Sequence, residues 1–74
     1  MSSTELIELA VEYIKKNSPE YYGTPDVLTE HKAEWTIGDK RYILERNVKY
    51  HRGFIFGYFG GEYPNGYELG RFYI

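Results

Sequence analysis

The chain has 74 residues, no cysteine and a net charge of −2. This length predicts a single domain spanning residues 1–74, and the lack of cysteine excludes disulfides and cysteine-ligated zinc. A chain this short buries only about 60% of its unfolded surface, so large side chains must supply the core. Aromatic residues form 19% of the chain, and nine of them are tyrosine. We therefore expect these rings to serve packing first and binding second.

The first residues predict a helix over residues 3–17. Ser2 and Glu5 fit the capping box that begins a helix. Acidic residues interrupt the apolar positions, which is not the pattern of a signal peptide, and no run of 18 apolar residues exists to span a membrane. We therefore expect no membrane partner and a cytoplasmic protein, located in the host cell if its source is viral. The apolar positions recur at helical spacing and form one stripe, made of Leu6, Ile7, Ala10, Val11 and Ile14.

Alternating polar and apolar residues predict a strand over 27–37 and a second strand over 40–48. Gly38-Asp39 between them is typical of a two-residue hairpin turn, which determines the register. Thr29 and His31 are expected on the face of the first strand that carries its apolar residues. This register predicts pairs of two apolar residues and pairs of opposite charges, which cross-strand pairing favours. The predicted pairs are Trp35 with Tyr42, Ala33 with Leu44, and Lys32 with Glu45.

Two more strands are expected, over residues 53–59 and 67–74. The residues between them, 60–66, contain three glycines and a Pro-Asn pair, and this composition predicts a loop. The fold class that follows is α+β, with one N-terminal helix packed on a four-stranded antiparallel meander sheet. The apolar stripe of the helix and one face of the sheet would cover each other.

The stretch RGFIFGYF, residues 52–59, contains alternating aromatic residues. It resembles the RNP1 motif of RNA-recognition domains, because Arg52, Gly53, Phe54, Phe56 and Phe59 match that motif. The resemblance implies that alternate rings of this strand stack on bases. It covers eight residues, and the expected order of elements differs from that family's β-α-β-β-α-β order. We therefore infer a likeness of the motif and no membership of the family.

A basic segment precedes this stretch, since residues 40–52 hold five cations and one acid, while residues 1–39 hold three lysines and eight acids. One interpretation is a binder of single-stranded nucleic acid or of a nucleotide. The other is structural, with residues 53–59 as a core strand and residues 40–52 as a solvated arm. The residues expected to carry nucleic-acid binding are Arg46, Lys49, Tyr50, Arg52, Phe54 and Phe56.

Tyrosine is in surplus, because the core of so small a domain cannot hold nine of these side chains. Tyrosine and acidic residues occur together in two predicted loops, over residues 20–22 and 62–67. Tyrosine is enriched at protein interfaces. The preferred hypothesis is a small protein-binding module, a regulator or inhibitor of a larger protein or nucleoprotein machine. A phage or mobile-element anti-defence role, anti-CRISPR-like, is the favoured setting, and a homodimer is compatible with it. The expected partner-binding residues are Glu20, Tyr21, Tyr22, Glu62, Tyr63 and Tyr67.

Catalysis is not expected from this sequence. The serines lie near predicted helix ends, and His31 and His51 have no spacing that would recommend a catalytic triad. Two histidines twenty residues apart do not form a metal-ligand set, and no glycine-rich loop precedes a helix. We therefore predict a non-enzymatic protein with no catalytic residues, no cofactor and no metal.

Overall fold

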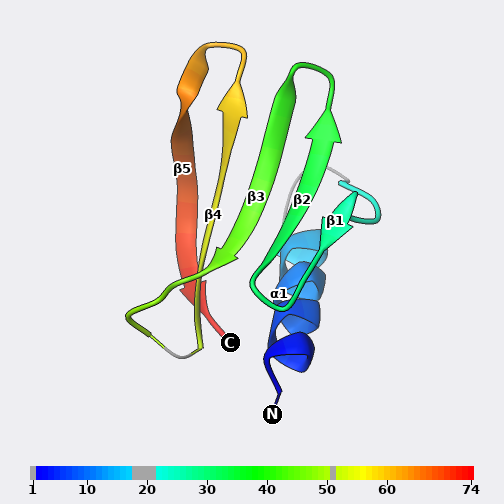
Figure 1. The fold of residues 1–74 in the computed structure, drawn as a ribbon, viewed down its shortest axis with the longest axis vertical. Helices are drawn as coiled ribbons and strands as arrows, with labels where there is room; N and C mark the ends of the chain where they lie inside the picture. Colours follow the sequence, from blue (N-terminus) through cyan, green and yellow to red (C-terminus); the bar gives the residue numbers. More distant parts are fainter. Residues whose placement is uncertain (1, 18–21, 51) are drawn as a thin grey trace.

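The structure is a computed structural model that describes residues 2–17, 22–50 and 52–74. The strands form one antiparallel sheet in chain order, and the helix lies against one face of it (Figure 1). The predicted α+β class with an N-terminal helix and an antiparallel meander is therefore confirmed, with five strands in place of four. The elements are α1 (Ser3–Asn17), β1 (Val27–Leu28), β2 (Lys32–Ile37), β3 (Lys40–Arg46), β4 (Gly53–Gly60) and β5 (Tyr63–Tyr73).

Helix α1 begins and ends where the sequence predicts. The Oγ of Ser2 accepts a hydrogen bond from the backbone N–H of Glu5 at 3.2 Å, and Glu5 Oε1 accepts one from the Ser2 backbone at 3.4 Å. These two bonds satisfy N–H groups that have no partner inside the helix. All five residues of the predicted apolar stripe are buried, which turns that side of α1 toward the sheet.

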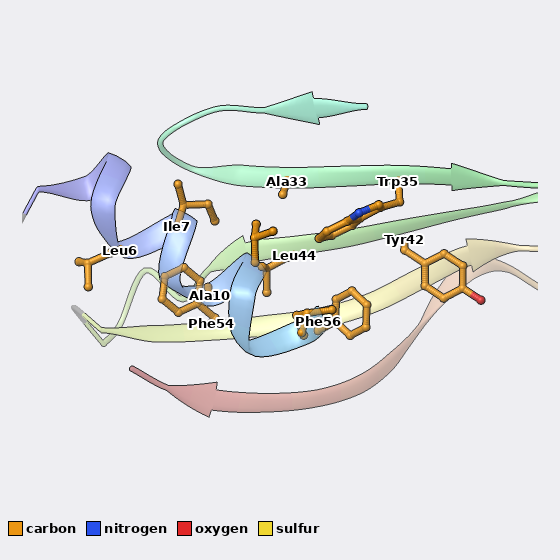
Figure 2. Close-up of a cluster of buried hydrophobic side chains, with 11 residues drawn as sticks. Leu6, Ile7, Ala10, Ala33, Trp35, Tyr42, Leu44, Phe54 and Phe56 are labelled. Carbon is orange, nitrogen blue, oxygen red and sulfur yellow. The ribbon is translucent and has the colours of Figure 1, made fainter. Parts of the chain in front are cut away.

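The core lies between α1 and the sheet (Figure 2). Trp35 and Phe54 are its largest fully buried side chains. The indole Nε1 of Trp35 donates a hydrogen bond to the carbonyl oxygen of Gly23 at 2.9 Å, so the one polar atom of this ring has a partner. On the sheet, the buried side chains come from alternating positions of β2, β3 and β4, namely Ala33, Trp35, Tyr42, Leu44, Phe54 and Phe56.

The β2–β3 hairpin has the predicted register. Gly38 has φ of 62°, the left-handed conformation that such a turn requires and that glycine adopts without strain. The six cross-strand pairs include the three that the sequence predicts, Trp35 with Tyr42, Ala33 with Leu44, and Lys32 with Glu45.

The prediction of one continuous strand over 27–37 is wrong. The chain turns back after Leu28, so that β1 pairs with β2 and forms the fifth strand. The Thr29 hydroxyl accepts hydrogen bonds from the backbone N–H groups of His31 and Lys32, each at 3.1 Å. A threonine that bonds its own backbone in this way competes with the strand ladder. Thr29 and His31 therefore belong to this turn and not to the apolar face of β2.

The prediction of a loop over 60–66 is also wrong, because β5 begins at Tyr63. Gly60 and Gly61 have φ of 114° and 56°, and they reverse the chain within a short turn. Pro64 lies inside a strand, which is tolerated because β5 is at the edge of the sheet, where an N–H can be missing. The register shifts between Tyr58 and Gly60 absorb the extra residues of β5.

The face of the sheet opposite α1 carries charged side chains in pairs. Glu34 accepts contacts from Lys32 Nζ at 2.8 Å and Arg41 Nε at 3.7 Å, and the guanidinium of Arg41 lies 5.4 Å from the ring centroid of Phe59. These pairs shield half-buried apolar residues such as Ile43 from water. This face is therefore explained as a solvated surface, and we place no site there.

Candidate functional site

Three tyrosines lie together near the turn of the β4–β5 hairpin, which extends beyond α1 (Figure 1). The ring centroids are 6.0 Å apart for Tyr58 and Tyr63, 5.8 Å for Tyr58 and Tyr67, and 4.8 Å for Tyr63 and Tyr67. We call these three residues the tyrosine tip. Tyr58 is half-buried, whereas Tyr63 and Tyr67 are 40% and 47% exposed. Each ring thus packs on the other two, and two of them remain open to a partner.

The tyrosine tip is connected to the core by further rings. The centroid of Tyr58 is 5.3 Å from that of Tyr42, and Tyr42 is 4.8 Å from Tyr22. Tyr22 in turn lies 5.6 Å from Phe56 and 6.0 Å from Trp35. Offset and edge-to-face pairs of this kind add stabilisation beyond burial. The tip is therefore the outer end of a continuous aromatic cluster, and its rings are held in place by the core.

A groove of about 520 Å³ runs beside the tyrosine tip, between the C-terminal half of α1 and strands β3 to β5. Gly70 leaves this groove open, because a Cβ atom added there would meet nothing within 4 Å. Among the residues that the structure describes, the lining contains two cations and no acidic residue. The residues that form it are Tyr13, Ile14, Asn17, Tyr22, Lys40, Tyr42, Phe56, Tyr58, Leu69, Gly70, Arg71 and Phe72.

The two cations of the groove differ in their partners. Arg71 Nε donates to Glu68 Oε1 at 3.0 Å, so its charge is compensated. Lys40 is half-buried, and its Nζ lies 5.1 Å from the ring centroid of Tyr58. Across residues 2–17, 22–50 and 52–74, Lys40 has no ion pair within 4.0 Å. The carboxylate of Asp39 is also near Gly61, as the Lys40 side chain is, but the two do not form an ion pair. Within the described ranges, the groove therefore has one ammonium group that forms no ion pair.

The predicted partner-binding residues fall into three groups. Glu62, Tyr63 and Tyr67 lie together and exposed at the turn of the β4–β5 hairpin. Tyr22 is half-buried in the aromatic cluster, where it packs against the core. Glu20 and Tyr21 lie outside the described residues. The structure thus brings three of the six into one surface.

The predicted nucleic-acid residues are separated by burial. Phe54 is fully buried and Phe56 is 7% exposed, so neither ring is available to stack on a base in this structure. Arg46 is half-buried, and its guanidinium lies 6.0 Å from the Phe54 ring centroid. The expectation that residues 53–59 form a core strand is favoured over the stacking interpretation. Lys49 and Arg52 are exposed near the opposite end of the sheet from the tyrosine tip, as is Tyr50, which packs on Tyr73.

Of the described residues that line the groove, only Tyr22 and Phe56 are among those predicted for the site. The missing residues include Lys40, Tyr58 and Gly70, which give the groove its charge and its open space. The signal for Lys40 was present, because the hairpin register puts it on the same face as Tyr42. Its position beyond the end of α1 depends on how the helix crosses the sheet. The space above Gly70 likewise depends on packing and carries no sequence signal.

Groups suited to metal binding are not brought together in the part of the chain that the structure describes. No cluster of three or more His, Asp or Glu side chains occurs among those residues. His31 is exposed, and its Nε2 lies 3.3 Å from Glu30; His51 is outside the described residues. No helix in the described ranges is long and apolar enough to cross a membrane.

Comparison with protein-family models, with curated proteins and with solved structures found no match for this chain. The function is therefore inferred from the chain's own side chains. Two features of the described residues are suited to binding: the tyrosine tip, and the groove with a lysine that forms no ion pair there.

Proposed function

We propose that this chain is a non-enzymatic protein-binding module that docks on its partner through the tyrosine tip. The observation that carries the proposal is the mutual packing of Tyr58, Tyr63 and Tyr67 near a hairpin turn that extends beyond the helix. Two of these rings remain substantially exposed in spite of that packing. Exposed, ordered tyrosines with a polar hydroxyl are typical anchors of protein interfaces.

The fixed positions of these rings favour a high affinity for the partner. A side chain that becomes fixed on binding costs about 0.5–1.5 kcal/mol of conformational entropy. The rings of the tyrosine tip already contact one another and, through Tyr42, the core, so little of that cost is left for the complex. Glu62 at the same turn adds a negative charge at the rim. A partner with an apolar patch beside a basic residue would complement this surface.

A module of this size acts by occupying a surface of its partner. We propose that it regulates or inhibits a larger protein or nucleoprotein machine, and an anti-defence protein of a phage or other mobile element remains the favoured setting. The small domain, its high aromatic content and its ordered exposed rings support this proposal.

In-cell photo-crosslinking tests the proposal and identifies the partner in the same experiment. A photoreactive benzoylphenylalanine replaces Tyr63 in one variant, Tyr67 in a second and Tyr73 in a third. Tyr73 is the matched control, because it is 64% exposed and is near the other end of β5. We expect one protein to be captured from positions 63 and 67, and not from position 73.

The captured protein is then purified and titrated by calorimetry. We expect Tyr63→Ala and Tyr67→Ala each to weaken binding by about 30-fold, the effect of losing an interface anchor worth about 2 kcal/mol. Tyr73→Ala should change affinity by less than about twofold. The proposal would be overturned if the unmodified chain and the three alanine variants bound the partner with equal affinity, or if the partner were captured from position 73 alone.

A further inference from the structure

We propose that the groove beside the tyrosine tip binds an extended segment of the protein partner, with an apolar side chain and a carboxylate four residues apart. The inference rests on the proposed function, since it names what the partner would present. It is carried by two features at different points along the groove, the space above Gly70 and the unpaired ammonium of Lys40.

The apolar position is at Gly70. Gly70 is opposite Phe56 in the β4–β5 pairing, and both line the groove together with Phe72. A glycine here leaves the space that a side chain would fill, while its φ is not in the left-handed region and sets no demand for glycine. An apolar side chain of a partner that enters this space would be buried against aromatic rings, and such burial is favourable.

The charged position is at Lys40. Its Nζ lies over the ring of Tyr58 and has no carboxylate within ion-pair distance in the described part of the chain. None of the described residues that line the groove is acidic, so an incoming carboxylate meets no like charge from them. A charge-assisted hydrogen bond to an ammonium group is stronger than a neutral one. The site therefore favours a carboxylate over a neutral or basic side chain.

The register of the sheet sets the spacing between these positions. Gly70 is opposite Phe56 on β4, whereas Lys40 is opposite Gly60, four residues further along the same strand. Four residues of a strand span about 13 Å at about 3.3 Å each. In an extended ligand, side chains four residues apart also point to the same side. Gly70 and Lys40 lie on the two strands that flank β4, so a segment that crosses β4 obliquely can place its apolar residue at Gly70 and its carboxylate within reach of the Lys40 side chain.

Two synthetic peptides test this inference, one for each direction of the segment: acetyl-Gly-Phe-Ser-Ser-Ser-Asp-Gly-amide and acetyl-Gly-Asp-Ser-Ser-Ser-Phe-Gly-amide. Each has a control in which asparagine replaces the aspartate. Titration is followed by ¹⁵N-resolved amide shifts of the full chain. We expect one aspartate peptide to bind with a Kd of about 1 mM, to shift the amides of Tyr58 and Gly70, and to bind about three- to tenfold more tightly than its asparagine control.

Variants of the protein locate the contact. Lys40→Gln should weaken the aspartate peptide by about three- to tenfold and leave the asparagine peptide unchanged, so that the two changes do not add. Lys49→Gln removes the same charge from an exposed position near the other end of the sheet and should have no effect. Gly70→Val should fill the groove and weaken both peptides by about tenfold without unfolding the chain.

Three results would overturn the inference: equal affinity of the aspartate and asparagine peptides, no effect of Lys40→Gln, or shifts that map away from the groove. The absence of any amide shift at peptide concentrations up to roughly 10 mM counts as the third of these results. The outcome is separable from that of the proposed function. If neither peptide binds but Tyr63→Ala and Tyr67→Ala weaken binding of the captured partner, the proposed function is supported and the groove inference is wrong. If an aspartate peptide binds as expected but the tyrosine variants bind the partner normally, only the groove inference is supported.

Discussion

Gly57 on β4 and Tyr67 on β5 approach so closely that no side chain fits between them. A Cβ atom at Gly57 would lie 2.6 Å from the carbonyl oxygen of Tyr67 and 3.1 Å from the Cα of Glu68. The approach occurs at a shift in register, where Phe56 pairs with Gly70 and Gly57 pairs with Glu68. Leu69 is the extra residue of this bulge, so the missing side chain at position 57 permits the irregular path of β5.

We expect Gly57→Ala to lower the free energy of unfolding by about 1–3 kcal/mol, because a methyl group forced against backbone cannot be relieved by rotating a side chain. The matched control is Gly70→Ala on the neighbouring strand, where a Cβ atom meets nothing within 4 Å. That change should be neutral or stabilise by up to about 1 kcal/mol, since it restricts the unfolded chain. Urea denaturation of both variants measures the difference, and equal stabilities would contradict the packing described at Gly57.

The helix cap offers a second prediction. Ser2→Ala removes the oxygen that accepts the N–H of Glu5 and should lower the free energy of unfolding by about 1 kcal/mol. Thr4→Ala, in the exposed first turn, is the control and should change stability by less than about 0.5 kcal/mol. Thermal unfolding followed by circular dichroism distinguishes the two variants. A loss in Thr4→Ala as large as that in Ser2→Ala would argue against the capping box.

A stacked pair of rings connects the helix to the last strand. Tyr13 on α1 and Phe72 on β5 have ring centroids 4.3 Å apart and planes inclined by 20°. A double-mutant cycle with Tyr13→Ala and Phe72→Ala should give a coupling energy of about 0.5–1.5 kcal/mol, because the contact is lost only once. The same cycle with Tyr13→Ala and Tyr50→Ala serves as the control and should give about zero. Additive losses for Tyr13 and Phe72 would show that the stacking contributes no stability.

The buried ring of Phe54 separates the core interpretation of β4 from the base-stacking one. Phe54→Ala should lower the free energy of unfolding by about 3–5 kcal/mol, a large part of the roughly 4–11 kcal/mol expected for a domain of this length. Arg52→Ala, at an exposed side chain two residues before it, should cost less than about 0.5 kcal/mol. Denaturation curves test both values. A stable Phe54→Ala protein that loses salt-sensitive binding of single-stranded DNA would restore the stacking hypothesis.

The bounds of α1 and the pairing of β2 with β3 could be predicted from the sequence because both depend on local patterns. The helix has an apolar stripe at a period of 3.6 and its own capping residues. A two-residue turn at Gly38-Asp39 determines which residues face each other in the hairpin. In both cases the interacting residues are close together in the chain, so their interaction can be predicted from the local sequence.

The two errors of strand assignment concern competition between local and longer-range bonds. Thr29 bonds to the backbone of the residues after it and ends β1 within what reads as continuous alternation. The glycines that predict a loop over residues 60–66 instead allow a short turn and irregular pairing of β5. Pro64 is tolerated in β5 because this strand is at the edge of the sheet. Alternation alone cannot tell whether a residue bonds to its neighbours or to a partner strand.

The α+β class, the apolar face of the helix, the hairpin register and the surplus of tyrosine all follow from patterns of neighbouring residues and from composition. Which aromatic residues are available to a partner depends on the tertiary packing. It buried Phe54 and Phe56, exposed Tyr63 and Tyr67, and placed Lys40 and Gly70 along one groove. Exposure depends on where α1 ends over the sheet, because that position is set by the packing of residues far apart in the chain.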